Sequence, residues 1–272
     1  MSYIYFLLTF FISYSVFSQK LEGRDSLYVK NGLNKLPSFT INGDNYFITG
    51  SSIEGQPKAE NSDTKIQIGF KQRLTDSELP WNTYLFFTYK QKAFWDTYKK
   101  SLPFRETNYN PGISVIKPFF KNGMLEEFLI FQFEHESNGR DLEYSRSWNY
   151  VSIRYIKYLS DKFTASIKFW LPVGSLDDNP NIIKYRGNQQ IDMAFKLNEN
   201  IFFDSEIRKT YSFDLKGSLL LGLNLRLSKK TNQYLYLQYY LGYSESLIDY
   251  DKHTQKIRIG IAFKDLFLKF RK

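Results

Sequence analysis

A histidine and a serine stand two residues apart in a stretch where they could carry out nucleophilic chemistry. Residues 128–137 read FLIFQFEHES, and alternate positions separate into two sets. His135 and Ser137 fall in the set that is otherwise leucine and phenylalanine, whereas the other set contains Gln132, Glu134 and Glu136. Side chains of a β-strand alternate between its two faces, so His135 and Ser137 are predicted to share an apolar face. Their backbones would be about 7 Å apart, a gap that a Ser–His hydrogen bond can span.

An amide is predicted to join this pair from the next strand. After Asn138-Gly139, which is typical of a turn, the chain returns through residues 147–155 with Asn149 in the same alternating set as Val151 and Ile153. A nucleophile, a base and a group that can orient the base would then meet on one face. A His-x-Ser pair is also compatible with two polar side chains in a lipid headgroup layer, and that alternative stays open at this point.

The elements that position these residues are predicted to be strands, because period-two alternation recurs along the chain. Residues 190–197, 219–227 and 256–264 each place large apolar side chains at every second position, with mostly polar residues or glycine between them. Helical spacing does not produce this pattern. Turn signals stand between such runs, for example Asp177-Asp178-Asn179-Pro180.

Composition favours a membrane barrel over the other all-β folds. The chain has 272 residues, 18% aromatic residues and a mean hydropathy of −0.43. That mean fits a barrel whose lipid-facing apolar residues alternate with polar residues facing the lumen. Without an 18-residue leader, about 20 residues per strand and connection give roughly twelve strands. We therefore predict an all-β fold, a transmembrane antiparallel β-barrel of about 12 strands, with a soluble β-sandwich as the alternative. The absence of cysteine excludes disulfides and thiolate zinc sites.

Three segments are predicted along the chain. Residues 1–18 carry no charged side chain and contain strongly apolar runs, which indicates a secretory signal peptide, with an uncleaved anchor as the alternative. Residues 19–44 are expected to form an irregular periplasmic lead-in, and residues 45–272 the barrel. Leu266, Leu268 and Phe270 alternate toward the C-terminus as barrel-assembly signals do. The predicted location is the bacterial outer membrane.

The formal net charge of +9 suggests a partner of opposite charge. Lysine and arginine on barrel loops would meet anionic headgroups of outer-membrane lipids. Nucleic-acid binding is disfavoured, because the basic residues are scattered along the chain rather than gathered into a stripe.

At this point the sequence resembles the outer-membrane phospholipase A family. The similarity lies in the blocks 135–140 (HESNGR) and 145–149 (SRSWN), and in the stretches 103–109 (PFRETNY), 177–180 (DDNP) and 245–250 (ESLIDY). These blocks span most of the predicted barrel. The loop 141–144 (DLEY) departs from the family pattern, which leaves open whether a single chain has a calcium site of its own.

The resemblance implies a twelve-stranded barrel and a calcium-dependent hydrolase that removes acyl chains from phospholipids and lysophospholipids. It implies Ser137 as nucleophile, His135 as general base and acid, Asn149 as the group that orients His135, and the backbone N–H of Gly139 as an oxyanion donor. It also implies Ca²⁺ ligands, which are the carbonyl of Arg140, Ser145, Asp178 and, from a second subunit, Ser101.

The resemblance further implies a homodimer with Gln91 at its interface, where the amide is expected to find its only hydrogen-bond partner. Two other functions remain open. One is an inactive barrel or pore, and the other is an acyl hydrolase acting on lipid A.

Overall fold

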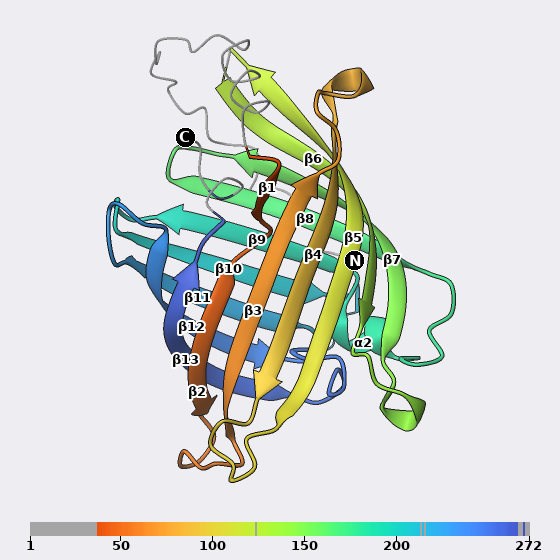
Figure 1. Ribbon diagram of the computed structural model, residues 1–272, viewed down its shortest axis with the longest axis vertical. Coiled ribbons are helices and arrows are strands. Elements are labelled where there is room, and N and C mark those ends of the chain that lie inside the picture. Colours follow the sequence, from red (N-terminus) through yellow and green to blue (C-terminus); the bar gives the residue numbers. More distant parts are fainter. Residues whose placement is uncertain (1–36, 123, 213, 215, 266–268, 270–272) are drawn as a thin grey trace, which may run out of the picture.

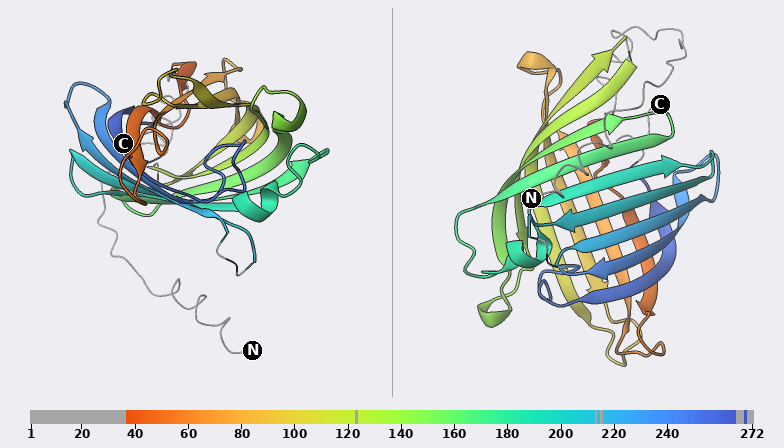
Figure 2. Two further views of the ribbon diagram at one scale, coloured as in Figure 1. Left: turned by 90° about the horizontal axis from the view of Figure 1, so that it is seen from below. Right: turned by 180° about the vertical axis from the view of Figure 1, so that it is seen from behind.

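The chain forms a closed antiparallel β-barrel in a computed structural model that describes residues 37–122, 124–212, 214, 216–265 and 269. Consecutive strands pair from β2 to β13, and β13 pairs with β2, which closes a ring of twelve strands. Figure 1 shows these strands tilted across the wall, and Figure 2 shows the ring in cross-section. The prediction of an all-β transmembrane barrel of about twelve strands is confirmed.

The strands of the ring have the following bounds: β2 Asn45–Ser52, β3 Ser62–Arg73, β4 Tyr84–Trp95, β5 Phe104–Lys121, β6 Met124–Ser137, β7 Ser147–Tyr158, β8 Phe163–Val173, β9 Gln189–Lys196, β10 Ile201–Lys209, β11 Ser218–Arg226, β12 Gln233–Gly242 and β13 Thr254–Phe263. The helical elements of the described residues are short: η2 Pro80–Asn82, η3 Leu142–Tyr144 and α2 Ile182–Arg186. No helix in these ranges is long and apolar enough to cross a membrane.

Alternation decides which side chains fill the barrel. In β12, Tyr234, Tyr236 and Tyr240 are buried, while the leucines between them are more exposed. The outward face therefore offers aliphatic side chains to lipid, and the inward face offers rings and polar groups to one another. Strands β9, β11 and β13 follow the alternation predicted for residues 190–197, 219–227 and 256–264.

The sheet begins earlier than the sequence suggested. A short strand, β1 (Phe39–Ile41), pairs with residues 70–72 of β3 within the range 19–44, where an irregular lead-in was predicted. The backbone breaks at Gly43, whose φ is +72°, and β2 then resumes pairing with β3. The alternation of residues 39–41 is too short to indicate a strand by itself. The predicted signal peptide and the C-terminal residues Leu266, Leu268 and Phe270 lie outside the described residues.

One end of the barrel carries most of the long connections. The loops 96–103, 138–146, 174–188 and 243–253 all follow strands that run toward this end, which is the lower end in Figure 1. We call it the loop end. Most connections at the opposite end are tight, such as residues 159–162 and 197–200. Ser137 is the last residue of β6 and Asn149 lies near the start of β7, so both are placed at the loop end.

Candidate active site

Strand β6 presents His135 and Ser137 on the outside of the barrel. Glu134 and Glu136 are buried in the interior, whereas Phe131 and Phe133 on the other face are 53% and 44% exposed. His135 and Ser137 belong to the outward set, as alternation predicted, and both are half-buried. Ionisable groups on a lipid-facing surface are costly, which marks this position as a functional candidate.

Asn149 fixes the orientation of the imidazole. The register of β6 and β7 places Asn149 directly opposite His135. His135 Nδ1 lies 2.9 Å from Asn149 Oδ1. Since an amide oxygen can only accept, Nδ1 carries the proton and donates it, which leaves Nε2 with its lone pair free. A ring held in this tautomer presents a basic nitrogen on the apolar face that also carries Ser137.

The two inward residues that flank His135 on β6, Glu134 and Glu136, each form an ion pair inside the barrel. Glu134 lies 2.6 Å from Lys168 Nζ of β8 and accepts a hydrogen bond from Ser152 Oγ at 2.9 Å. Glu136 lies 2.9 Å from an Arg186 guanidinium nitrogen of α2. Buried pairs of this kind fix geometry, because releasing one partner leaves a buried charge uncompensated. The backbone that carries His135 is thereby held from inside.

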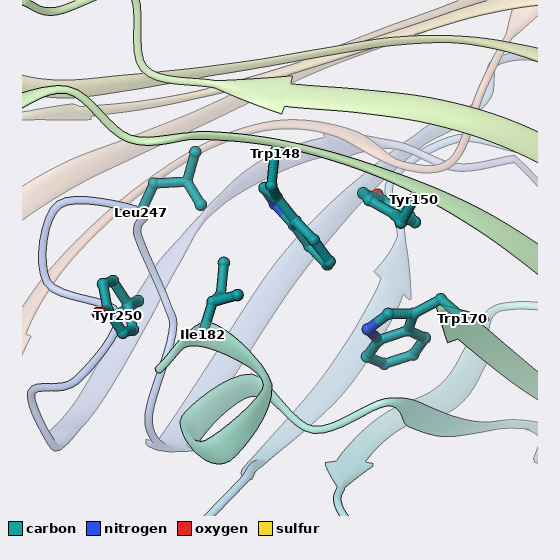
Figure 3. Close-up of a cluster of buried hydrophobic side chains, with 6 residues drawn as sticks. All are labelled: Trp148, Tyr150, Trp170, Ile182, Leu247 and Tyr250. Atoms are coloured by element: carbon teal, nitrogen blue, oxygen red, sulfur yellow. The ribbon is translucent and has the colours of Figure 1, made fainter. Parts of the chain in front are cut away.

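A cluster of buried aromatic side chains holds the strand that carries Asn149. Trp148 and Tyr150, the two neighbours of Asn149, point inward and stack with ring centroids 4.2 Å apart. They pack with Trp170 of β8, Ile182 of α2 and, from loop 243–253, two further residues shown in Figure 3, Leu247 and Tyr250. The outward amide therefore sits between two anchored residues.

The hairpin 138–146 is shaped by the side chain of Asn138. Its amide oxygen accepts from the backbone N–H of Arg146 at 3.0 Å and of Arg140 at 3.3 Å, and its amide nitrogen donates to the carbonyl of Tyr144 at 2.9 Å. Gly139 adopts a φ of +65°, in the left-handed region that favours glycine. A Cβ added there would lie 3.2 Å from the ring of Tyr109. The backbone conformation therefore favours glycine at this position, and any side chain would be tight against the ring of Tyr109.

Oxygen groups meet beside this hairpin. Ser145 Oγ donates to Asp178 Oδ2 at 2.9 Å, joining two of the predicted calcium ligands from different loops. Arg140 lies in the same hairpin, whereas Ser101 lies exposed in loop 96–103. Hydroxyl, carboxylate and carbonyl oxygens are the donors that Ca²⁺ prefers. In the ranges that the structure describes, no three His, Cys, Asp or Glu side chains gather into a metal-binding group. The Ser145 hydroxyl and the Asp178 carboxylate are oxygen donors of the kind that suits a hard cation.

Gln91 differs from the sequence-based expectation in one respect. Its amide oxygen accepts a hydrogen bond from Tyr89 Oη, two residues earlier on β4, at 2.8 Å. The expectation that this amide finds a partner only in a dimer is therefore wrong for its oxygen. Sequence reasoning overlooked the pair because two outward residues of one strand were treated separately.

Sequence reasoning also missed the inward residues that support the site, above all Asn138, Glu136 and Glu106. Alternation predicted that the glutamates point inward, but nothing local in the sequence indicates their partners. Glu136, for example, meets an arginine fifty residues later. Glu106 and Asn138 do lie in the stretches 103–109 and 135–140, which resemble the phospholipase A family, and this resemblance is the signal in the sequence that points to them.

Comparison with known proteins supplies the family. The family model described as phospholipase A1 matches residues 33–263. Phospholipase A1 from Escherichia coli K12 is 31% identical over 222 residues, which cover 80% of this chain and 75% of that protein. Phospholipase A1 from Klebsiella pneumoniae is 32% identical over 221 residues, which cover 79% and 75%.

Solved structures agree with the sequence comparison. Outer membrane phospholipase A from E. coli superimposes with a TM-score of 0.75 at 28% identity, covering 85% of this chain and 100% of that one. The Salmonella typhi outer membrane phospholipase, solved as a dimer with bound calcium, gives a TM-score of 0.73 at 27% identity, covering 84% and 93%. The family resemblance, the predicted enzyme class and the predicted location are confirmed. This chain belongs to the phospholipase A1 family and is an outer-membrane phospholipase.

Proposed function

We propose that this phospholipase is a calcium-dependent hydrolase of phospholipid and lysophospholipid acyl esters, and that its Ser-His-Asn site lies on the lipid-facing exterior. The observation that carries the proposal is the 2.9 Å contact between His135 Nδ1 and Asn149 Oδ1, on the face and at the end of the barrel where Ser137 lies. A passive pore has no use for an oriented imidazole on its lipid face. An E. coli relative solved as an active-site mutant with asparagine replaced by alanine supports a catalytic role for an asparagine.

The residues have distinct roles in the proposed reaction. Ser137 Oγ attacks the ester carbonyl while His135 Nε2 accepts its proton. The tetrahedral intermediate collapses, and His135 returns the proton to the departing alcohol, which leaves the acyl group on Ser137. A water molecule, deprotonated by His135, then attacks the acyl-enzyme, and His135 returns this proton to Ser137 Oγ as the fatty acid leaves. Asn149 keeps the imidazole in position, although a neutral amide stabilises imidazolium less than a carboxylate would.

Groups of the hairpin 138–146 are proposed to stabilise the negative charge that develops on the carbonyl oxygen. The backbone N–H of Gly139 is the proposed oxyanion donor, since it lies two residues after Ser137, the last residue of β6. The proposed Ca²⁺ ligands are the carbonyl of Arg140, the side chains of Ser145 and Asp178, and Ser101 of a second subunit. When bound, the ion supplies positive charge near the developing oxyanion. The Ser145–Asp178 contact supports this donor set, because it brings two of its oxygens within 2.9 Å.

We also propose that the active form is a homodimer. His135, Ser137 and Asn149 lie on the outer wall of the barrel, so one chain offers only one side of a groove for an acyl chain. A second copy on the same face would offer the other side, with Gln91 at the contact. The Salmonella typhi relative, a dimer with calcium, supports this arrangement. Calcium binding and dimerisation would then be linked, each strengthening the other by the same factor.

The test of the proposed function is lipid hydrolysis by the purified barrel in detergent micelles, followed by mass spectrometry with calcium and with chelator. The proposal predicts fatty-acid release from phospholipids and lysophospholipids that requires calcium. Release from lipid A alone would indicate the other acyl hydrolase, and no release from any lipid would indicate an inactive barrel.

A further inference from the structure

Glu106, on the inner face of β5, joins two segments that are far apart in the sequence. Its side chain is buried, and its two carboxylate oxygens have different partners. Oε1 accepts from Asn108 Nδ2 at 2.6 Å and from the backbone N–H of Ile248 at 3.1 Å. Oε2 accepts from Asn138 Nδ2 at 3.5 Å and lies 3.5 Å from Arg140 Nε. One oxygen thus faces loop 243–253, and the other faces the hairpin 138–146.

Loop 243–253 folds inward at the loop end of the barrel (Figure 2), where buried contacts hold it in place. The stretch Ser244–Leu247 is buried, and Glu245 pairs with Arg258 at 2.6 Å and with Lys65 at 3.0 Å. The backbone N–H of Leu247 donates to Asn108 Oδ1 at 3.1 Å, which ties the loop to β5. This loop contains the block 245–250, to which the proposed reaction assigns no role.

The two hairpin residues that Glu106 holds are the neighbours of Gly139. Asn138 precedes it and Arg140 follows it, and Oε2 contacts the side chains of both. Arg140 is further held by a hydrogen bond from its guanidinium to the carbonyl of Arg105. The carboxylate therefore contacts the side chains on both sides of Gly139.

We propose that Glu106 is a positioning residue, which sets the oxyanion donor and the calcium-binding carbonyl of the hairpin by anchoring them to loop 243–253. This inference rests on the proposed function. It adds that the inner face of the barrel, and in particular one oxygen of one carboxylate, controls calcium affinity and turnover at a site on the outer face.

The chemistry of glutamine gives a selective test. In Glu106→Gln the amide oxygen can keep the bonds from Asn108 and Ile248, but the amide nitrogen then faces two other donors, Asn138 Nδ2 and Arg140 Nε. The substitution therefore breaks the hairpin side and spares the loop side. Asn108→Ala is the matched control, because it removes contacts to Glu106 Oε1 and Leu247 and leaves Oε2 in place.

The experiment measures hydrolysis kinetics and calcium titrations of both variants in phospholipid mixed micelles, with direct calcium binding followed by calorimetry. For Glu106→Gln we expect kcat to fall about tenfold or more, because an oxyanion donor is displaced. We also expect the apparent calcium constant to weaken several-fold, with KM little changed. Asn108→Ala should lower the thermal midpoint without shifting the calcium constant.

A second variant keeps the test independent of folding. Arg140→Met removes the guanidinium contact to Glu106 Oε2, so it should weaken calcium binding as Glu106→Gln does, with a less-than-additive effect when the two are combined. A Glu106→Gln protein that folds and has the calcium constant and kcat of the wild type would overturn the inference. Equal calcium shifts in Glu106→Gln and Asn108→Ala would do so too, because they would indicate a general structural role. A wild type without hydrolysis or calcium response would instead overturn the proposed function.

Discussion

The outer and inner faces of the same two strands differ sharply in how their side chains are held. Outside, His135 and Asn149 share one hydrogen bond in a largely apolar surface. Inside, Glu134 and Glu136 are each held by a cation and by hydrogen bonds from neighbouring side chains. Because side chains alternate along a strand, every outward reactive residue lies between two inward anchored ones. The barrel interior therefore supplies the support for the reactive side chains that other enzymes build around a cleft.

The largest effect should come from the outer face itself. Ser137→Ala should reduce fatty-acid release below about one thousandth of the wild-type rate, since the other members of a catalytic group act only through the nucleophile. The barrel should remain folded, as judged by heat-dependent mobility on gels. Substantial turnover by the folded alanine variant would exclude serine catalysis.

A graded effect should separate the base from the residue that orients it. His135→Ala should lower kcat by about 10²–10⁴-fold, the usual contribution of a general base. Asn149→Ala should cost less, because an unoriented imidazole still reaches Ser137 in part of its conformations. The measurement is kcat for both variants in the same micelles. Equal losses, or no loss in Asn149→Ala, would contradict the assigned role.

A substitution on the inner face should lower the free energy of unfolding more than it lowers the rate of hydrolysis. Arg186→Met leaves Glu136 without its 2.9 Å partner, with Lys92 as a remaining cation near it. We expect the free energy of unfolding to fall by about 3 kcal/mol, as for other broken buried pairs. Denaturant unfolding in lipid vesicles measures this change, and kcat per folded molecule should fall far less than in Ser137→Ala. Unchanged stability would show that the inner pair gives no support.

The smallest effect is expected at the opposite end of the barrel. Glu199 pairs with Lys196 in an exposed tight connection, far along the strands from loop 138–146. Glu199→Gln should leave both stability and hydrolysis at the wild-type level, since exposed pairs contribute little. A marked loss of activity in this variant would mean that the distinction between the supporting inner face and the rest of the barrel is wrong.

The fold and the outer part of the site follow from local rules, whereas the support does not. Period-two alternation was enough to predict a barrel of about twelve strands and to place His135, Ser137 and Asn149 on one face. It could not predict that Glu136 meets Arg186 or that loop 243–253 folds inward to Glu106, because those contacts join residues separated by up to 142 positions. The break at Gly43 was missed because it depends on how β1 and β2 each pair with β3. The Tyr89–Gln91 hydrogen bond was missed because alternation gives the face of each residue but not the rotamers that bring two outward side chains of one strand together.

Covalent labelling tests the central claim most directly, which is that an oriented serine on the lipid-facing wall carries out the hydrolysis. The purified barrel would be treated with a long-chain sulfonyl fluoride, with calcium or with chelator, and the modified residue identified by mass spectrometry of peptides. The account predicts a single adduct on Ser137 that forms rapidly only with calcium and only while His135 is present. An adduct on another serine, or an active enzyme that leaves Ser137 unmodified, would contradict it.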